Sequence, residues 1–87
     1  MRLIELIARA SGWTAEITTI YVTEPWSCEA EAILVSPAPD TTEPTERDGR
    51  RYCYFLETFI AREVLDCLDG APAERCERLI DYARSDA

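Results

Sequence analysis

Apolar residues recur at helical spacing in three parts of the chain, and each spacing predicts an amphipathic helix. The first part ends at Gly12, a residue type that commonly caps helices. Its apolar face consists of Leu3, Leu6, Ile7 and Ala10. The last part follows Pro72, which suits the first turn of a helix. Its apolar face consists of Cys76, Leu79, Ile80 and Ala83.

Residues 50–69 hold the longest stretch with this spacing, and the spacing predicts one long helix packed on a core. Its apolar stripe consists of Cys53, Leu56, Ile60, Val64 and Cys67, with Tyr52, Phe59 and Leu68 on its flanks. One alternative stays open, in which RYCYFL (51–56) is a strand entered through an Asp48–Gly49 turn. The helical projection places Glu57 within the apolar stripe, which favours this alternative. The Arg62–Asp66 pair favours a helix from about Tyr52 onward.

Between the first two helical parts the pattern changes to that of strands. TAEITTIYVT (14–23) is rich in β-branched residues and is predicted to be a strand. A turn at 24–27 leads to CEAEAILVS (28–36), where apolar residues alternate with glutamate as in a hairpin strand with one solvated face. Alanine and glutamate also favour helices, and Thr23 would cap one beginning at Glu24, so a helix over 28–36 stays open.

The segment PAPDTTEPTERDG (37–49) has the composition of a long, mobile loop, because its prolines, acids and glycine cannot build a core. The sequence therefore predicts a single small α+β domain over residues 1–87, in the order α-β-β-α-α. In this arrangement a two-stranded antiparallel hairpin packs on the C-terminal helices, since a hairpin alone is marginally stable in water.

The four cysteines are the residues of this sequence that most suggest a reactive or metal-binding site. Cys53, Cys67 and Cys76 fall on the predicted apolar faces, and free cysteine is among the residue types most often buried. The chain has no histidine and no C-x-x-C pair, so the spacing lacks the paired ligands of a usual zinc site. We expect these thiols to be reduced and packed in a core, with no metal, disulfide or other cofactor.

Residues suited to catalysis are scarce. Neither histidine nor lysine is present, and the three glycines are scattered instead of forming a phosphate-binding loop. Glu63 lies at the edge of the long apolar stripe, where burial would raise the pKa of its carboxyl group. A position at the rim, paired with an arginine such as Arg78, fits the pattern better. We expect a protein that is not an enzyme.

The net charge of the chain narrows the classes of function that remain. Aspartate and glutamate total 17 against 9 arginines, giving a formal net charge of −8. Such a chain repels the phosphate backbone, so no direct binding of nucleic acid is expected. No apolar stretch has the length of a signal peptide or a membrane span, and we expect a cytoplasmic protein without membrane contact. The acidic surface serves solubility, but it also favours a basic protein partner. Homodimer formation is compatible with the same features.

The functional hypothesis is a small acidic inhibitor that binds the basic surface of a larger nucleic-acid-handling complex. Phage-encoded inhibitors of bacterial defence, such as anti-CRISPR proteins, are commonly of this size and acidity, and this analogy of class rests on no motif. Two alternatives would bind a partner through the same kind of acidic surface. The first is an immunity protein or antitoxin, and the second is a regulatory subunit of a larger complex. The predicted partner-binding residues are exposed acids and two boundary tryptophans: Glu43, Glu46, Asp48, Asp66, Asp69, Glu74, Glu77, Asp81, Trp13 and Trp26.

Overall fold

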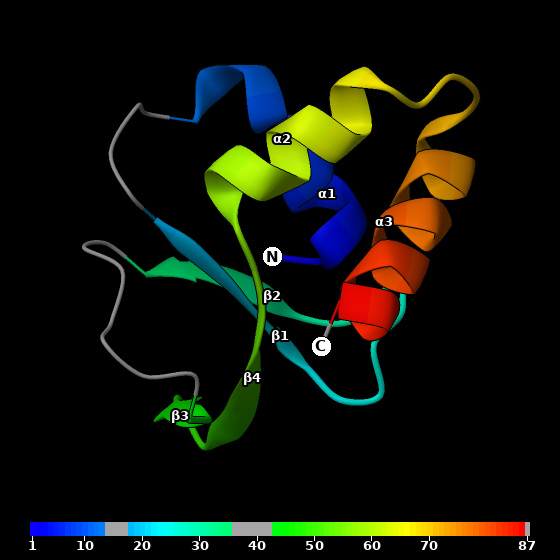
Figure 1. The fold of residues 1–87 in the computed structure, drawn as a ribbon. Coiled ribbons are helices and arrows are strands. Elements are labelled where there is room, and N and C mark those ends of the chain that lie inside the picture. The colour runs from blue at the N-terminus through cyan, green and yellow to red at the C-terminus, as the bar shows by residue number, and fades with distance from the viewer. Residues whose placement is uncertain (14–17, 36–42, 87) are drawn as a thin grey trace.

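The computed structural model describes residues 1–13, 18–35 and 43–86, which form an α+β fold (Figure 1). The helices lie on one side of an antiparallel sheet that, in the described part of the chain, has four strands in the order β2-β1-β4-β3. In chain order the elements are α1 (Leu3–Ala8), the 3-10 helix η1 (Ala10–Gly12), β1 (Thr19–Thr23), β2 (Ala32–Val35), β3 (Thr45–Arg47), β4 (Arg50–Glu57), α2 (Thr58–Asp66) and α3 (Pro72–Asp86).

The α+β class is confirmed, whereas the predicted order α-β-β-α-α and the two-stranded hairpin are wrong in detail. The strand expected over 14–23 is present as β1, although residues 14–17 lie outside the described part. The strand interpretation of 28–36 is correct for β2. The two additional strands, β3 and β4, lie in segments that were predicted to be a loop and the start of a helix.

The prediction of one long helix from about Tyr52 is wrong, and the strand alternative is confirmed. β4 runs to Glu57, and α2 begins at Thr58. The reason is an irregularity in the pairing with β1, where Ile20 pairs with Leu56 but Tyr21 pairs with Tyr54. A bulged strand contributes one extra residue, so its side chains do not alternate strictly between faces. Consecutive apolar residues of β4 are therefore both buried, and the segment imitates helical spacing.

The predicted loop over 37–49 is in part a strand. Residues 45–47 form β3, which pairs with β4 from Thr45 opposite Tyr52 to Arg47 opposite Arg50. Residues 37–42 of that prediction lie outside the described part of the chain. Asp48 and Gly49 have φ angles of 53° and 76°, in the left-handed region that two-residue hairpin turns require. This turn chemistry is the reason that so polar a segment joins the sheet.

One hydrophobic core joins the inner side of the sheet to all three α-helices. Its members come from the three α-helices, from the two central strands, from the start of β2 and from the connector before it: Leu3, Leu6, Ile7, Ile20, Val22, Ala30, Ala32, Phe55, Leu56, Ala61, Leu65, Cys76, Leu79, Ile80 and Ala83. The four apolar residues predicted for the face of the last helix are all buried in α3. The residues before α1 extend the sheet, because Ala32 N–H donates to the Met1 carbonyl oxygen at 2.7 Å. None of the described helices has the length and hydropathy needed to cross a membrane.

Candidate functional site

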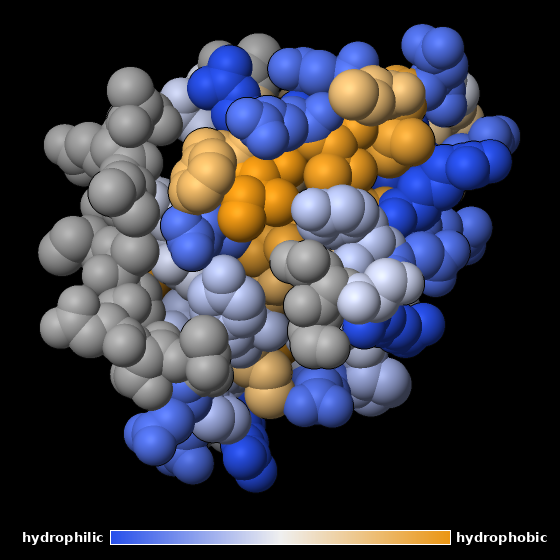
Figure 2. Space-filling view, in the orientation of Figure 1, coloured by the Kyte–Doolittle hydropathy of each residue, from blue (hydrophilic) through white to orange (hydrophobic). Residues whose placement is uncertain are grey.

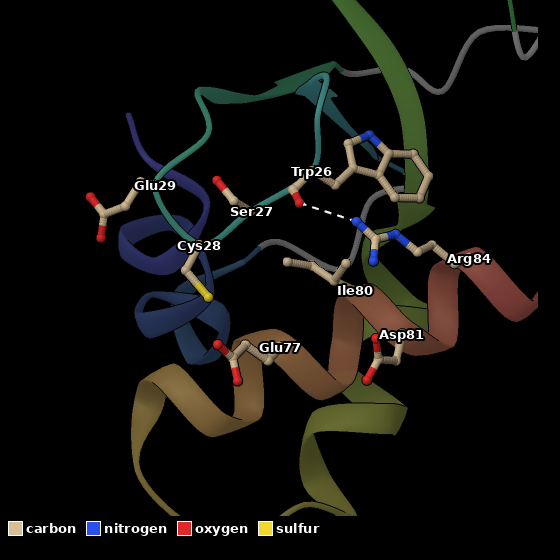
Figure 3. A pocket seen from close by; sticks show the side chains of 8 residues that line it. All are labelled: Trp26, Ser27, Cys28, Glu29, Glu77, Ile80, Asp81 and Arg84. Atoms are coloured by element: carbon tan, nitrogen blue, oxygen red, sulfur yellow. Dashed lines mark hydrogen bonds between the residues drawn. The ribbon is translucent and has the colours of Figure 1, made fainter.

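A groove of about 500 Å³ separates α3 from the connector between β1 and β2, residues 24–31 (Figure 3). It is lined by Trp26, Ser27, Cys28, Glu29, Glu77, Ile80, Asp81 and Arg84. The α3 wall of the groove is fixed because Cys76, Leu79 and Ala83 lie on the face of the helix that packs in the core. Residues about 100° around the helix from that face then point toward the connector. The groove therefore has an apolar floor at Ile80 and a charged rim.

The charges of this acidic groove are only partly compensated. Arg84 Nη2 donates to the Trp26 carbonyl oxygen at 3.3 Å, so its guanidinium group is held on one wall (Figure 3). Glu29 accepts from Arg2 Nη1 at 2.6 Å and is paired outside the groove. Glu77 and Asp81 form no ion pair within the described residues. Two exposed carboxylates on consecutive turns of α3 thus remain for a cationic group.

Trp26 forms the end wall of the acidic groove and is half-buried. Its ring meets Phe55 edge to face, with the centroids 5.0 Å apart and the planes at 82°. The Trp26 Nε1–H group is buried and has no hydrogen-bond partner in the described part of the structure. Trp26 is therefore anchored in the core edge while its backbone fixes Arg84.

Trp13 lies elsewhere, in a second groove of about 500 Å³ that is lined mostly by apolar groups. The groove also includes Met1, Leu6, Arg9, Gly12 and Leu34. Trp13 is half-buried, and its Nε1–H group also lacks a partner among the residues described here. The two tryptophans thus belong to separate surfaces, of which only the one at Trp26 carries several acids.

The eight predicted acidic residues are all exposed, but they do not form one surface. Glu43, Glu46 and Asp48 lie in and beside β3, at the far end of the sheet from the first turns of α3 (Figure 1). Asp66 and Asp69 lie at the end of α2, and Glu74, Glu77 and Asp81 lie along α3. Apart from Glu43, none of the eight has a side chain with an ion pair or hydrogen bond in the described chain. The structure thus brings Glu77 and Asp81 together with Trp26 and leaves the others dispersed.

The acids near the N-terminus are different, because each has a cation beside it. Arg2 Nε donates to Glu5 Oε1 at 2.8 Å, and this hydrogen bond lowers the pKa of Glu5. Glu31 lies 3.1 Å from the terminal ammonium group of Met1 and 3.5 Å from Arg50 Nη1. The compensated carboxylates therefore surround α1 and the connector, whereas the uncompensated ones lie on α2, α3 and the β3 hairpin.

The prediction of three packed cysteines is correct only for Cys76, which is fully buried in α3. Burial, followed by the neighbouring Cys28 thiol, raises the pKa of Cys76. Cys53 is half-buried in β4, where its Sγ–H group donates to Glu24 Oε1 at 2.9 Å and this bond raises the pKa of Cys53. Cys67 is exposed at the end of α2, because α2 begins later and is oriented differently from the predicted helix.

Two further chemical hypotheses can be compared with the structure. Glu63 is exposed on α2, so it is not a buried acid, and it has no ion pair with Arg78. Within residues 1–13, 18–35 and 43–86, no three histidine, cysteine or acidic side chains are grouped so that they could hold a metal ion. Comparisons with protein-family models, curated proteins and solved structures give no match for this chain. Its surface chemistry must therefore carry the functional argument.

Sequence reasoning missed Glu29, Ser27 and Cys28 as neighbours of Glu77 and Asp81. The connector and α3 are almost fifty residues apart, and no periodicity links them. The only signal was indirect: Trp26 at an element boundary was expected to form part of an interface.

Proposed function

We propose that this chain is a non-enzymatic binding protein that inhibits a larger, basic, nucleic-acid-handling protein by stoichiometric binding. The observation that carries the proposal is the acidic groove, where Glu77 and Asp81 stand uncompensated beside the Trp26 wall. Arginine and lysine side chains are the protein groups that such carboxylates bind best. A basic side chain of the partner would enter between α3 and the connector.

The net charge of −8 supports the same proposal at longer range. Complementary charge speeds the encounter of two proteins and suppresses wrong partners, while the final affinity depends on the central contacts. The dispersed acids of the β3 hairpin and of α2 would contribute mainly to the encounter. A basic surface that normally holds a nucleic acid is the kind of surface on which an acidic protein acts as a competitor.

An immunity protein or antitoxin that neutralises a toxin is the second candidate, and a regulatory subunit of a larger complex is the third. All three would use the acidic groove in the same way. The identity of the partner separates them, since a toxin, a defence complex and a permanent assembly are different proteins.

The test begins with affinity capture from bacterial lysates that contain defence complexes. It compares the natural chain with Asp81→Lys and with Glu46→Lys, an equal charge change on the exposed β3 hairpin. The captured partner should be lost with Asp81→Lys, whereas Glu46→Lys should slow the encounter and still capture the partner. With the purified partner, raising salt from about 50 to about 500 mM should slow association at least about tenfold and change dissociation far less.

Two results would contradict the proposal. Equal capture by Asp81→Lys and the natural chain would remove the acidic groove from the interface. Inhibition of the partner at far less than one chain per target would show turnover instead of stoichiometric binding.

A further inference from the structure

The surface of α2 carries more apolar area than the core uses. The residues that α2 buries are Thr58, Ala61 and Leu65. Ile60 and Val64 pack against the edge of the core and are only partly buried, and Leu68, just beyond the C-cap residue Cys67, is also partly buried. Figure 2 shows the result as a band of hydrophobic atoms along α2 on the face in view.

Phe59 extends this band and is 53 % exposed, the largest exposure among the large apolar residues described. We call Phe59, Ile60, Val64 and Leu68 together the α2 surface. A helix that only needs to dock on its own core usually turns its largest apolar residues inward. α2 turns Leu65 inward but leaves Phe59 mostly exposed and covers Ile60 and Val64 only in part, and contiguous apolar surface of this kind is typical of binding sites.

The spacing of the α2 surface fits a helix as its partner. Ile60, Val64 and Leu68 are four residues apart, so they form one ridge of the kind that packs between the ridges of another helix. Leu68 continues the ridge because its N–H group donates to the Leu65 carbonyl oxygen at 3.1 Å. The ridge is about 12 Å long, at 1.5 Å per residue, which matches two turns of a partner helix.

α3 adds a second exposed aromatic residue on the side that faces α2. Arg75 of α3 defines this side, since its Nη2 donates to the Leu65 carbonyl oxygen of α2 at 3.2 Å. Tyr82 is seven residues further along, about two helical turns, and is therefore on the same side of α3. Its side chain is 39 % exposed. Tyr82 therefore adds an exposed aromatic group on this side of α3, and aromatic residues are common anchors of interfaces.

The charges around the α2 surface select the partner. Glu63, Asp66 and Asp69 lie in and just after α2, and Arg62 is the only cation between Thr58 and Gly70. A second copy of this chain would bring the same acidic rim and another net charge of −8 into contact. A partner helix with basic residues beside its apolar stripe has the opposite charge at the same rim.

We infer that the α2 surface binds an amphipathic helix with a basic rim, presented by the partner protein. This inference rests on the proposed function, which supplies the basic character of the partner. The acidic groove and the α2 surface would then bind different parts of the partner. The groove binds a cationic side chain, and the α2 surface binds the apolar face of a helix. Helix-in-groove recognition commonly uses anchors at this spacing.

The test uses two synthetic peptides of about 20 residues and nuclear magnetic resonance of the labelled chain. The first peptide has leucine at helical spacing and lysine and arginine elsewhere, and the second has serine in place of each leucine. The leucine peptide should shift the amide signals of residues 58–68 and bind at least about tenfold tighter than the serine peptide. The double variant Phe59→Ser, Val64→Thr should remove this preference. Leu34→Ser, at a residue 37 % exposed on β2, should keep it.

Each other outcome is decisive. Equal affinity for both peptides, with shifts confined to the acidic groove, would overturn the α2 inference and leave the proposed function standing. Failure of both peptides to bind at about 1 mM would count against the basic partner itself. Concentration-dependent dimerisation in sedimentation, abolished by Phe59→Ser, would assign the α2 surface to a second copy of the chain. An unchanged melting temperature of the double variant shows that any loss of binding does not come from unfolding.

Discussion

α2 and α3 are amphipathic helices in the same core, yet they divide their apolar residues differently. α3 buries its whole apolar face, from Cys76 to Ala83, to 5 % exposure or less. α2 buries Ala61 and Leu65 but leaves Ile60 and Val64 only partly covered at the edge of the core. Folding therefore accounts for the buried apolar face of α3, while α2 leaves apolar area, including Phe59, that the core does not cover. This difference is the reason that we propose a binding role for α2.

The largest expected contrast is between leucines of the two regions. Leu79→Ala in α3 removes a fully buried side chain and should lower the free energy of unfolding by about 2–5 kcal/mol. Leu68→Ala, at the half-exposed end of the α2 surface, should cost less than about 1.5 kcal/mol, because less area leaves contact. Urea denaturation of both variants measures the difference. Equal losses would show that the α2 surface is part of the core after all.

The thiols provide the next contrast. A thiol reagent added without denaturant should label exposed Cys67 at least about 100-fold faster than buried Cys76, which must wait for opening of the core. Mass spectrometry after proteolysis separates the two sites. Similar rates would mean that α3 opens as readily as the end of α2, and the distinction between the helices would fail.

A third contrast appears at alkaline pH. The folded-state pKa of Cys76 is raised from the ordinary 9.0 by burial, so the unfolded chain releases its proton first. The stability associated with this thiol is present below about pH 9 and is lost as pH rises toward the folded pKa. Between about pH 8 and 10.5, the free energy of unfolding should fall more steeply in the natural chain than in Cys76→Ala. The difference in slope approaches at most about 1.4 kcal/mol per pH unit.

The smallest expected effect belongs to Phe59. Phe59→Ser should change the free energy of unfolding by about 0.5 kcal/mol or less, since the side chain is mostly exposed. Thermal and urea unfolding measure this directly. A loss above about 2 kcal/mol would show that Phe59 holds α2 on the core, and its exposure would then have no functional meaning.

The same contrast explains what could be predicted from the sequence. The face of α3 was predicted residue by residue, because helical spacing is a local signal and the core lies on one side only. β4 was not predicted in this way, because the bulge opposite Ile20 and Tyr21 depends on pairing with β1, a strand about thirty residues earlier in the chain. β3 is three residues long and polar, so its place in the sheet depends on the Asp48–Gly49 turn and on β4.

For the candidate site, the sequence predicts which residues are exposed but does not predict which of them lie together. Exposure of the acids follows from residue type, and all eight are exposed. Their grouping does not follow from type, because Glu77 and Asp81 meet Trp26 only when the connector packs beside α3. The α2 surface was also hidden from sequence reasoning. Helical spacing shows that Ile60 and Val64 share a side, but it does not show whether that side meets the core.

The core is closed by segments from opposite ends of the chain. Leu3 and Ile7 of α1 share it with Leu79 and Ala83 of α3, and the two helices are in contact. A contact across more than seventy residues of sequence carries a high contact order, which slows folding. During synthesis, the part of the core that α3 covers must therefore remain exposed until α3 has left the ribosome. A translation product that stops after α2 would keep this surface exposed and would be a substrate for chaperones and proteases.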